Sequence, residues 1–149
     1  MLTGKDSIEL LSLFKKHNIR YLVVGGYAVM RYSEPRFTKD LDLWISTEKS
    51  NAEAVFSALK EFGAPLKGLN PDDFSKDGYF YQMGKPPLRF DIMMSIPGLE
   101  FESAWERRDE VQLEGLVIPF ISKEDLITAK LTSSRPQDLI DAENLKRTL

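Results

Sequence analysis

Apolar residues recur every three or four positions in several segments of the chain. This spacing is typical of helices that pack one face against a core. The helices predicted in this way cover residues 6–17, 27–32, 47–63 and 101–108. Residues 122–148 are predicted to form two C-terminal helices, because Ser122 to Asp125 resembles a capping box and Pro136 suits the first turn of a helix.

Shorter apolar or alternating runs lie between these segments and predict strands, because successive side chains of a strand point to opposite faces of a sheet. They cover residues 20–24, 40–45, 78–83, 88–94 and 111–121. A Gly-Lys-Pro-Pro turn joins the third and fourth strands and predicts a hairpin, whereas Glu114-Gly115 predicts a broken strand or a second hairpin. Residues 65–73 predict a loop.

Composition narrows the classes of protein that these elements can form. A chain of 149 residues is the size of a single domain with one core. It has no cysteine and one histidine, which excludes disulfides and thiolate metal sites and argues against a zinc site. Its net charge of −3 argues against a broad DNA-binding surface. No apolar run is long enough to span a membrane, and the N-terminus has no pattern of a secretory signal, so we expect a cytoplasmic protein.

The run DLDLWI at residues 40–45 carries the first candidate chemistry. Alternation places Leu41, Leu43 and Ile45 on one face of the predicted strand, and Asp40 and Asp42 on the other. Two carboxylates on one face can share a cation, and Mg²⁺ prefers such hard oxygen ligands together with waters and substrate phosphates. The alternative is a solvent-facing strand edge with ordinary charges.

The glycine pair Gly25-Gly26 lies between a predicted strand and a predicted helix. Glycine lets backbone N–H groups approach an anion closely, and the helix N-terminus adds a favourable partial charge, so the turn predicts a phosphate-binding site. The alternative is a tight turn that needs a positive φ. The carboxylate pair begins fourteen positions after Gly26 (40 minus 26), which favours the phosphate site.

Asp91 is the candidate for a third carboxylate. In LRFDIMMS, Leu88, Phe90, Ile92 and Met94 alternate with Asp91, which therefore projects from the face opposite an apolar row. If this strand lies beside the strand of Asp40 and Asp42 with matching faces, the three carboxylates form one site. The alternative is a surface aspartate on an exposed strand.

The segment GGYAVMRYSEPRFTKDLDLWI resembles the signature of the nucleotidyltransferase superfamily that includes DNA polymerase beta, and is most similar to its minimal bacterial branch. The resemblance implies that Gly25 and Gly26 hold a nucleoside triphosphate and that Asp40, Asp42 and Asp91 bind one or two Mg²⁺ ions, with Asp91 also taking the proton of the attacking hydroxyl. Many members have serine at the position of Gly26. Two further matches are Arg36 and Thr38, which would brace the turn or contact phosphate, or else are ordinary loop residues.

The C-terminal segment KLTSSRPQDLIDAENL resembles a second element of the superfamily. It implies that Lys130 faces the triphosphate as a point charge, although a surface lysine of a helix is an equal alternative. We expect Asp138 and Asp141 to brace Arg135 or a helix end.

Together these features predict a single α+β domain over residues 1–149, with a mixed sheet backed by helices and its core motifs in residues 21–94. By resemblance it is a Mg²⁺-dependent nucleotidyltransferase that moves a nucleoside monophosphate from an NTP to a hydroxyl of a protein, a tRNA or a small molecule. Such enzymes include toxins of toxin–antitoxin systems, so an antitoxin or a second copy of the chain is a candidate partner. The alternative is an inactive nucleotide-binding or protein-interaction module with the same fold.

Overall fold

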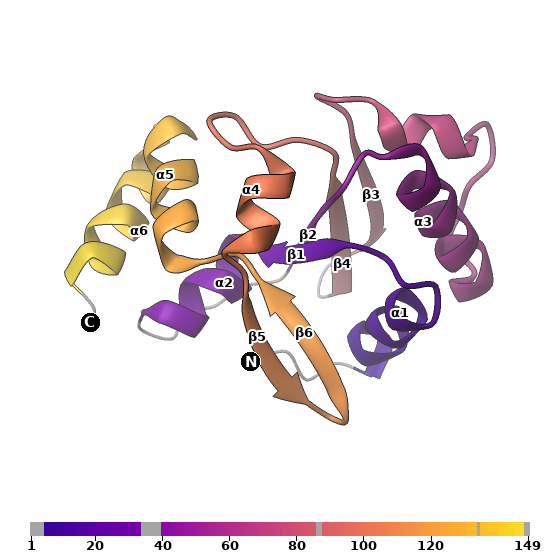
Figure 1. Ribbon diagram of the computed structural model, residues 1–149, viewed down its shortest axis with the longest axis horizontal. Coiled ribbons are helices and arrows are strands. Elements are labelled where there is room, and N and C mark those ends of the chain that lie inside the picture. The colour runs from indigo at the N-terminus through magenta and orange to yellow at the C-terminus, as the bar shows by residue number, and fades with distance from the viewer. Residues whose placement is uncertain (1–4, 34–39, 86–87, 134, 148–149) are drawn as a thin grey trace.

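The computed structural model describes residues 5–33, 40–85, 88–133 and 135–147. They form one α+β domain whose sheet has six strands (Figure 1). The strands are β1 (Tyr21–Val24), β2 (Asp40–Ile45), β3 (Phe80–Lys85), β4 (Leu88–Met93), β5 (Asp109–Leu113) and β6 (Leu116–Phe120). The helices are α1 (Lys5–Lys16), α2 (Gly25–Tyr32), α3 (Lys49–Phe62), the short 3-10 helix η1 (Pro71–Ser75), α4 (Phe101–Glu106), α5 (Lys123–Ser133) and α6 (Pro136–Arg147).

The sheet is mixed, as the sequence predicts. Its strand order is β3-β4-β2-β1-β6-β5. The pairs β2–β4 and β1–β6 are parallel, and the other three pairs are antiparallel. Because β2 and β4 are neighbours, the two strands that carry the candidate carboxylates lie side by side in the interior of the sheet.

The apolar side chains that the alternating pattern assigns to one face form the core. Leu41, Leu43 and Ile45 of β2 are buried together with Ile92 of β4. Helices α1 and α3 contact each other and bury their apolar sides in the same core, as the helical spacing predicts. Figure 1 shows α1 and α3 together at one side of the molecule, and α2, α5 and α6 together at the other.

Several boundaries differ from the prediction. Helix α2 begins at Gly25 itself rather than at residue 27. Of the two alternatives for residues 111–121, the hairpin is present, but its first strand β5 already begins at Asp109; its turn has a positive φ at both Glu114 and Gly115. The segment predicted to be a loop, residues 65–73, overlaps η1, because the side chain of Asn70 accepts a hydrogen bond from the N–H of Asp72 and caps the turn. Among the described helices, none is long and apolar enough to cross a membrane.

Candidate active site

The turn between β1 and α2 provides the floor of the site. Gly25 has a φ of +68°, which favours glycine. A β-carbon at this position would also collide with the carboxylate of Asp42. Glycine is therefore required here for two reasons, the backbone conformation and the close approach of Asp42, and the second reason is visible only in the structure.

Asp40, Asp42 and Asp91 come together beside this turn, as predicted. In the parallel pair β2–β4, Asp42 lies opposite Asp91 and Asp40 lies opposite Arg89. One carboxylate oxygen from each of the three aspartates lies within 4.8 Å of the other two. Asp91 is buried, whereas Asp40 and Asp42 are partly exposed. The register of two strands distant in sequence thus builds one cluster of three carboxylates, which we call the aspartate triad.

The aspartate triad is electrostatically unfavourable without a cation. Burial, a hydrogen bond with Asp91, and the negative charges of Asp91 and Asp40 raise the pKa of Asp42 to about 8, although Lys130 acts in the opposite direction. Asp91 Oδ1 is buried and has no hydrogen-bond partner among the described residues. Three converging carboxylates with an unpaired buried oxygen are a fitting donor set for a divalent ion such as Mg²⁺.

Arg89 is a residue of the site that sequence reasoning missed. Its Nη2 lies 2.8 Å from Asp40 Oδ2 and 3.4 Å from Asp91 Oδ2. The guanidinium therefore neutralises part of the charge of the aspartate triad. The signal was present in the sequence, because Arg89 stands two positions before Asp91 and the alternation of a strand puts both on one face.

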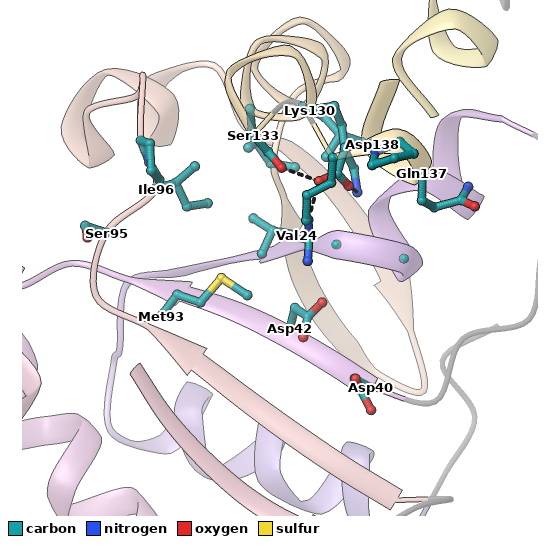
Figure 2. Close-up of a pocket in the computed structure, with 18 residues that line it drawn as sticks. Val24, Asp40, Asp42, Met93, Ser95, Ile96, Lys130, Ser133, Gln137 and Asp138 are labelled. Atoms are coloured by element: carbon teal, nitrogen blue, oxygen red, sulfur yellow. Dashed lines mark hydrogen bonds and ion pairs between the residues drawn. The ribbon is translucent and has the colours of Figure 1, made fainter. Parts of the chain in front are cut away.

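A cleft of about 550 Å³ opens above the glycine turn. Figure 2 shows Asp40 and Asp42 along one side of it and Lys130, Ser133 and Asp138 on the helices opposite. Gly25 and Gly26 also line the cleft. The volume lies within the range of ligand sites, about 300–1,000 Å³, so the cleft is large enough for a nucleotide.

Lys130 reaches the cleft but is already paired with carboxylates. Its Nζ lies 3.1 Å from Asp138 Oδ1 and 3.3 Å from Asp141 Oδ2. Arg135 Nε donates to Asp138 Oδ2 at 2.7 Å, which agrees with the expectation that an aspartate braces this arginine. We call Lys130, Arg135, Asp138 and Asp141 the α5–α6 ion-pair cluster. It joins the two C-terminal helices at the wall of the cleft.

Asp138 is the centre of this cluster. Burial would raise its pKa, but hydrogen bonds from Ser133, Arg135 and Lys130 outweigh burial and lower the pKa to about 2. The sequence predicted Arg135 as a partner of Asp138, but not Ser133 or Lys130. These two hydrogen bonds depend on how α5 turns into α6. Arg36 and Thr38, two predicted nucleotide-binding residues, lie outside the described residues.

Comparison with known proteins gives the class to which this fold and site belong. Residues 5–146 match the family described as "Nucleotidyltransferase of unknown function (DUF6036)", so the chain belongs to that family of nucleotidyltransferases. A comparison with curated proteins gave no match.

Solved structures share the fold over almost the whole chain. A crystal structure of the lincosamide antibiotic adenylyltransferase LnuA with lincomycin bound is 20% identical, with a TM-score of 0.60 over 98% of both chains. The protein TM1012 from Thermotoga maritima, described as a "putative nucleotidyltransferase", is 17% identical, with a TM-score of 0.63 over 94% of this chain and 88% of its own. A crystal structure of ANT(2")-Ia with adenylyl-2"-tobramycin is 14% identical, with a TM-score of 0.59 over 96% and 87%. At these identities the likeness shows the nucleotidyltransferase fold.

Proposed function

We propose that this nucleotidyltransferase transfers a nucleoside monophosphate from an NTP to a hydroxyl group of a small molecule, in a reaction that requires Mg²⁺. The observation that carries the proposal is the aspartate triad, whose oxygens lie within 4.8 Å of one another beside the glycine turn. The small-molecule acceptor is supported by two structures of similar fold, which hold lincomycin and an adenylylated tobramycin.

Each part of the site would have a defined task. Asp40, Asp42 and Asp91 would hold Mg²⁺, which neutralises charge on the triphosphate and polarises the phosphorus–oxygen bonds when it is bound. The backbone at Gly25 and Gly26, at the N-terminus of α2, would face the triphosphate. Lys130 lies on the opposite wall of the cleft and would add positive charge there.

The transfer itself needs a base and a leaving group. The acceptor oxygen forms a bond to the α-phosphorus, the bond from that phosphorus to the oxygen bridging the β-phosphate breaks, and pyrophosphate leaves with the electron pair. The proton of the acceptor hydroxyl passes to the carboxylate of Asp91. Its Oδ1 has no hydrogen-bond partner among the described residues, so this oxygen has capacity to accept the proton.

The other acceptors predicted from the sequence, a protein or a tRNA end, would fit a toxin with an antitoxin partner. No contact or surface of the described residues favours them over a small molecule, and they stay predictions.

The experiment is transfer of label from each of four α-³²P-labelled NTPs with Mg²⁺ to fractionated cell extract, and to lincomycin and tobramycin as defined acceptors. We expect label in the small-molecule fraction from the native chain and none from Asp42→Asn. Label on RNA or protein would refute the small-molecule acceptor. Mg²⁺-dependent NTP binding without any transfer would replace this proposal with a nucleotide-binding module, and no NTP binding would refute both.

A further inference from the structure

A second hollow of about 390 Å³ lies next to the cleft, and Asp91 belongs to it. Asp40 and Asp42 line the larger cleft, whereas Asp91 lines the second hollow, and both spaces share Met93, Ser95 and Pro97. The aspartate triad therefore stands between the two spaces. If the nucleotide occupies the larger cleft, the second hollow is the space from which another molecule can reach Asp91.

Strand register places an aromatic side chain on the same face as Asp91. In the antiparallel pair β3–β4, Phe80 lies opposite Met93 and Gln82 lies opposite Asp91. Paired residues of an antiparallel sheet share a face, so Phe80 and Gln82 stand on the face of the carboxylate. β3 is one of the two edge strands of the sheet.

Phe80 is unusually exposed for its size, with 66% of its surface accessible. Tyr79 lines the same hollow and is also exposed, so the two residues form an aromatic surface beside Asp91 that core packing does not account for. Its position is nevertheless well defined by the backbone. Ser95 Oγ accepts a hydrogen bond from the N–H of Gly78 at 2.8 Å, and the carbonyl of Tyr79 accepts one from the N–H of Met94 at 3.2 Å.

We infer that the second hollow is the acceptor site, and that it takes a small, uncharged molecule whose reactive hydroxyl adjoins a flat apolar or aromatic ring. This inference rests on the proposed function. The ring would stack on Phe80 while the hydroxyl points to Asp91.

The lining favours that class of acceptor over charged ones. Phe80, Met93 and Pro97 offer apolar surface, and Asp91 is the carboxylate among the described residues of the lining, none of which is lysine or arginine. Within the lining, a polycation would find no carboxylate other than Asp91, which the reaction uses. An RNA end would meet the exposed Asp77 nearby, while Lys76 is paired with Asp73 at 3.2 Å.

The test is an NMR titration of the full chain with phenyl β-D-glucopyranoside as the probe and D-glucose as its counterpart without the ring. Mg²⁺ and a non-transferable ATP analogue with a methylene bridge between the α- and β-phosphates are present throughout. We expect saturable shifts at the amides of Gly78 to Phe80 and Met93 to Ser95, with glucose binding at least about tenfold more weakly.

Two variants locate the binding on the aromatic ring. Phe80→Ser should weaken binding of the phenyl glucoside about tenfold, whereas Phe80→Trp should retain the binding. Val117→Ser is the matched control, because Val117 is an exposed apolar residue of β6. It should leave binding of the phenyl glucoside unchanged.

The same samples separate the failure of this inference from the failure of the proposed function. Shifts at Gly25 and Gly26 report binding of the ATP analogue, and their absence would refute the proposed function. The acceptor site is wrongly assigned if the ATP analogue binds but glucose binds as tightly as phenyl glucoside. The same conclusion follows if Phe80→Ser binds the phenyl glucoside as tightly as the native chain does. A single-stranded RNA that binds the hollow more tightly than the probe would overturn the class of acceptor.

Discussion

Replacing Asp42 by asparagine tests whether the aspartate triad is held together against its own repulsion. The three carboxylates bring one oxygen each within 4.8 Å, and two unit charges at that distance repel by about 3.5 kcal/mol at an effective dielectric constant of about 20. Arg89 and Lys130 offset part of this repulsion. We therefore expect Asp42→Asn to raise the free energy of unfolding by roughly 1–3 kcal/mol in metal-free buffer at pH 8.

The stabilisation should depend on pH with a definite sign. The pKa of Asp42 is raised to about 8 in the folded chain, whereas an unfolded aspartate loses its proton near pH 4. Between these values the folded state holds a proton that the unfolded state has lost, so the stability of the native chain falls as the pH rises. The advantage of Asp42→Asn should therefore be small at pH 4 and largest at pH 8.

Mg²⁺ should offset most or all of this advantage of the variant. A ligand at a hundred times its Kd stabilises the folded state by about 2.7 kcal/mol, and this gain requires the carboxylate that the variant lacks. The assay is urea unfolding of both proteins at pH 4 and pH 8, with EDTA or with excess Mg²⁺, beside the exposed control Asp77→Asn. In transfer assays Asp42→Asn should lose at least about a hundredfold in rate. A variant that is less stable than the native chain in EDTA at pH 8, or equal stabilisation of both by Mg²⁺, would refute the reasoning.

Three further substitutions probe the surroundings of the triad. Gly25→Ala should destabilise the fold by about 1–3 kcal/mol and abolish transfer, because the new β-carbon collides with Asp42. Gly115→Ala is the control, because Gly115 has a similar positive φ in open space and its substitution should cost only the backbone strain. The difference between the two variants in urea unfolding therefore measures the collision with Asp42. Arg89→Met should tighten Mg²⁺ binding about tenfold in calorimetry, because it removes a cation that competes for the aspartate triad. Arg31→Met breaks an exposed ion pair and should leave Mg²⁺ binding unchanged. Weaker Mg²⁺ binding by Arg89→Met would contradict the idea that Arg89 competes with the metal. The pKa of Asp138 is lowered to about 2, so its contribution of at most about 2 kcal/mol is present above pH 4 and is lost as the pH falls toward 2. Asp138→Asn should lower the free energy of unfolding by that amount at pH 7 and weaken its dependence on pH between pH 4 and pH 2. An unchanged pH dependence in this range would show that the ion pairs of Asp138 do not contribute to stability.

The elements and the faces of their side chains were predictable, because both follow from local spacing. The alternation in DLDLWI assigns Leu41 and Leu43 to the core and Asp42 to the opposite face, and the structure agrees. Helix ends, and the choice between a broken strand and a hairpin at residues 111–121, were less predictable. They depend on single caps and turns, such as the side chain of Asn70 and the positive φ of Glu114.

The contacts that define the site were predictable only in part. Asp91 was expected beside Asp42 on condition that two strands pair with matching faces, a condition that the parallel register of β2 and β4 meets. The pairing of Arg89 with Asp40, 49 positions away, follows from the same register and was not foreseen. Lys130 was expected to face a triphosphate, and its engagement with Asp138 and Asp141 emerged only from the packing of α5 on α6.

By itself, then, the sequence determined the period of each element, the apolar face that each buries, the glycine turn and the acidic character of the opposite face. These are properties of neighbouring residues, and backbone geometry transmits them over a few positions. Tertiary structure alone decided which carboxylates meet, which cations balance them and where Phe80 stands relative to Asp91. Those outcomes depend on strand order and register, and a shift of one residue in the pairing would turn every side chain of a strand to the other face.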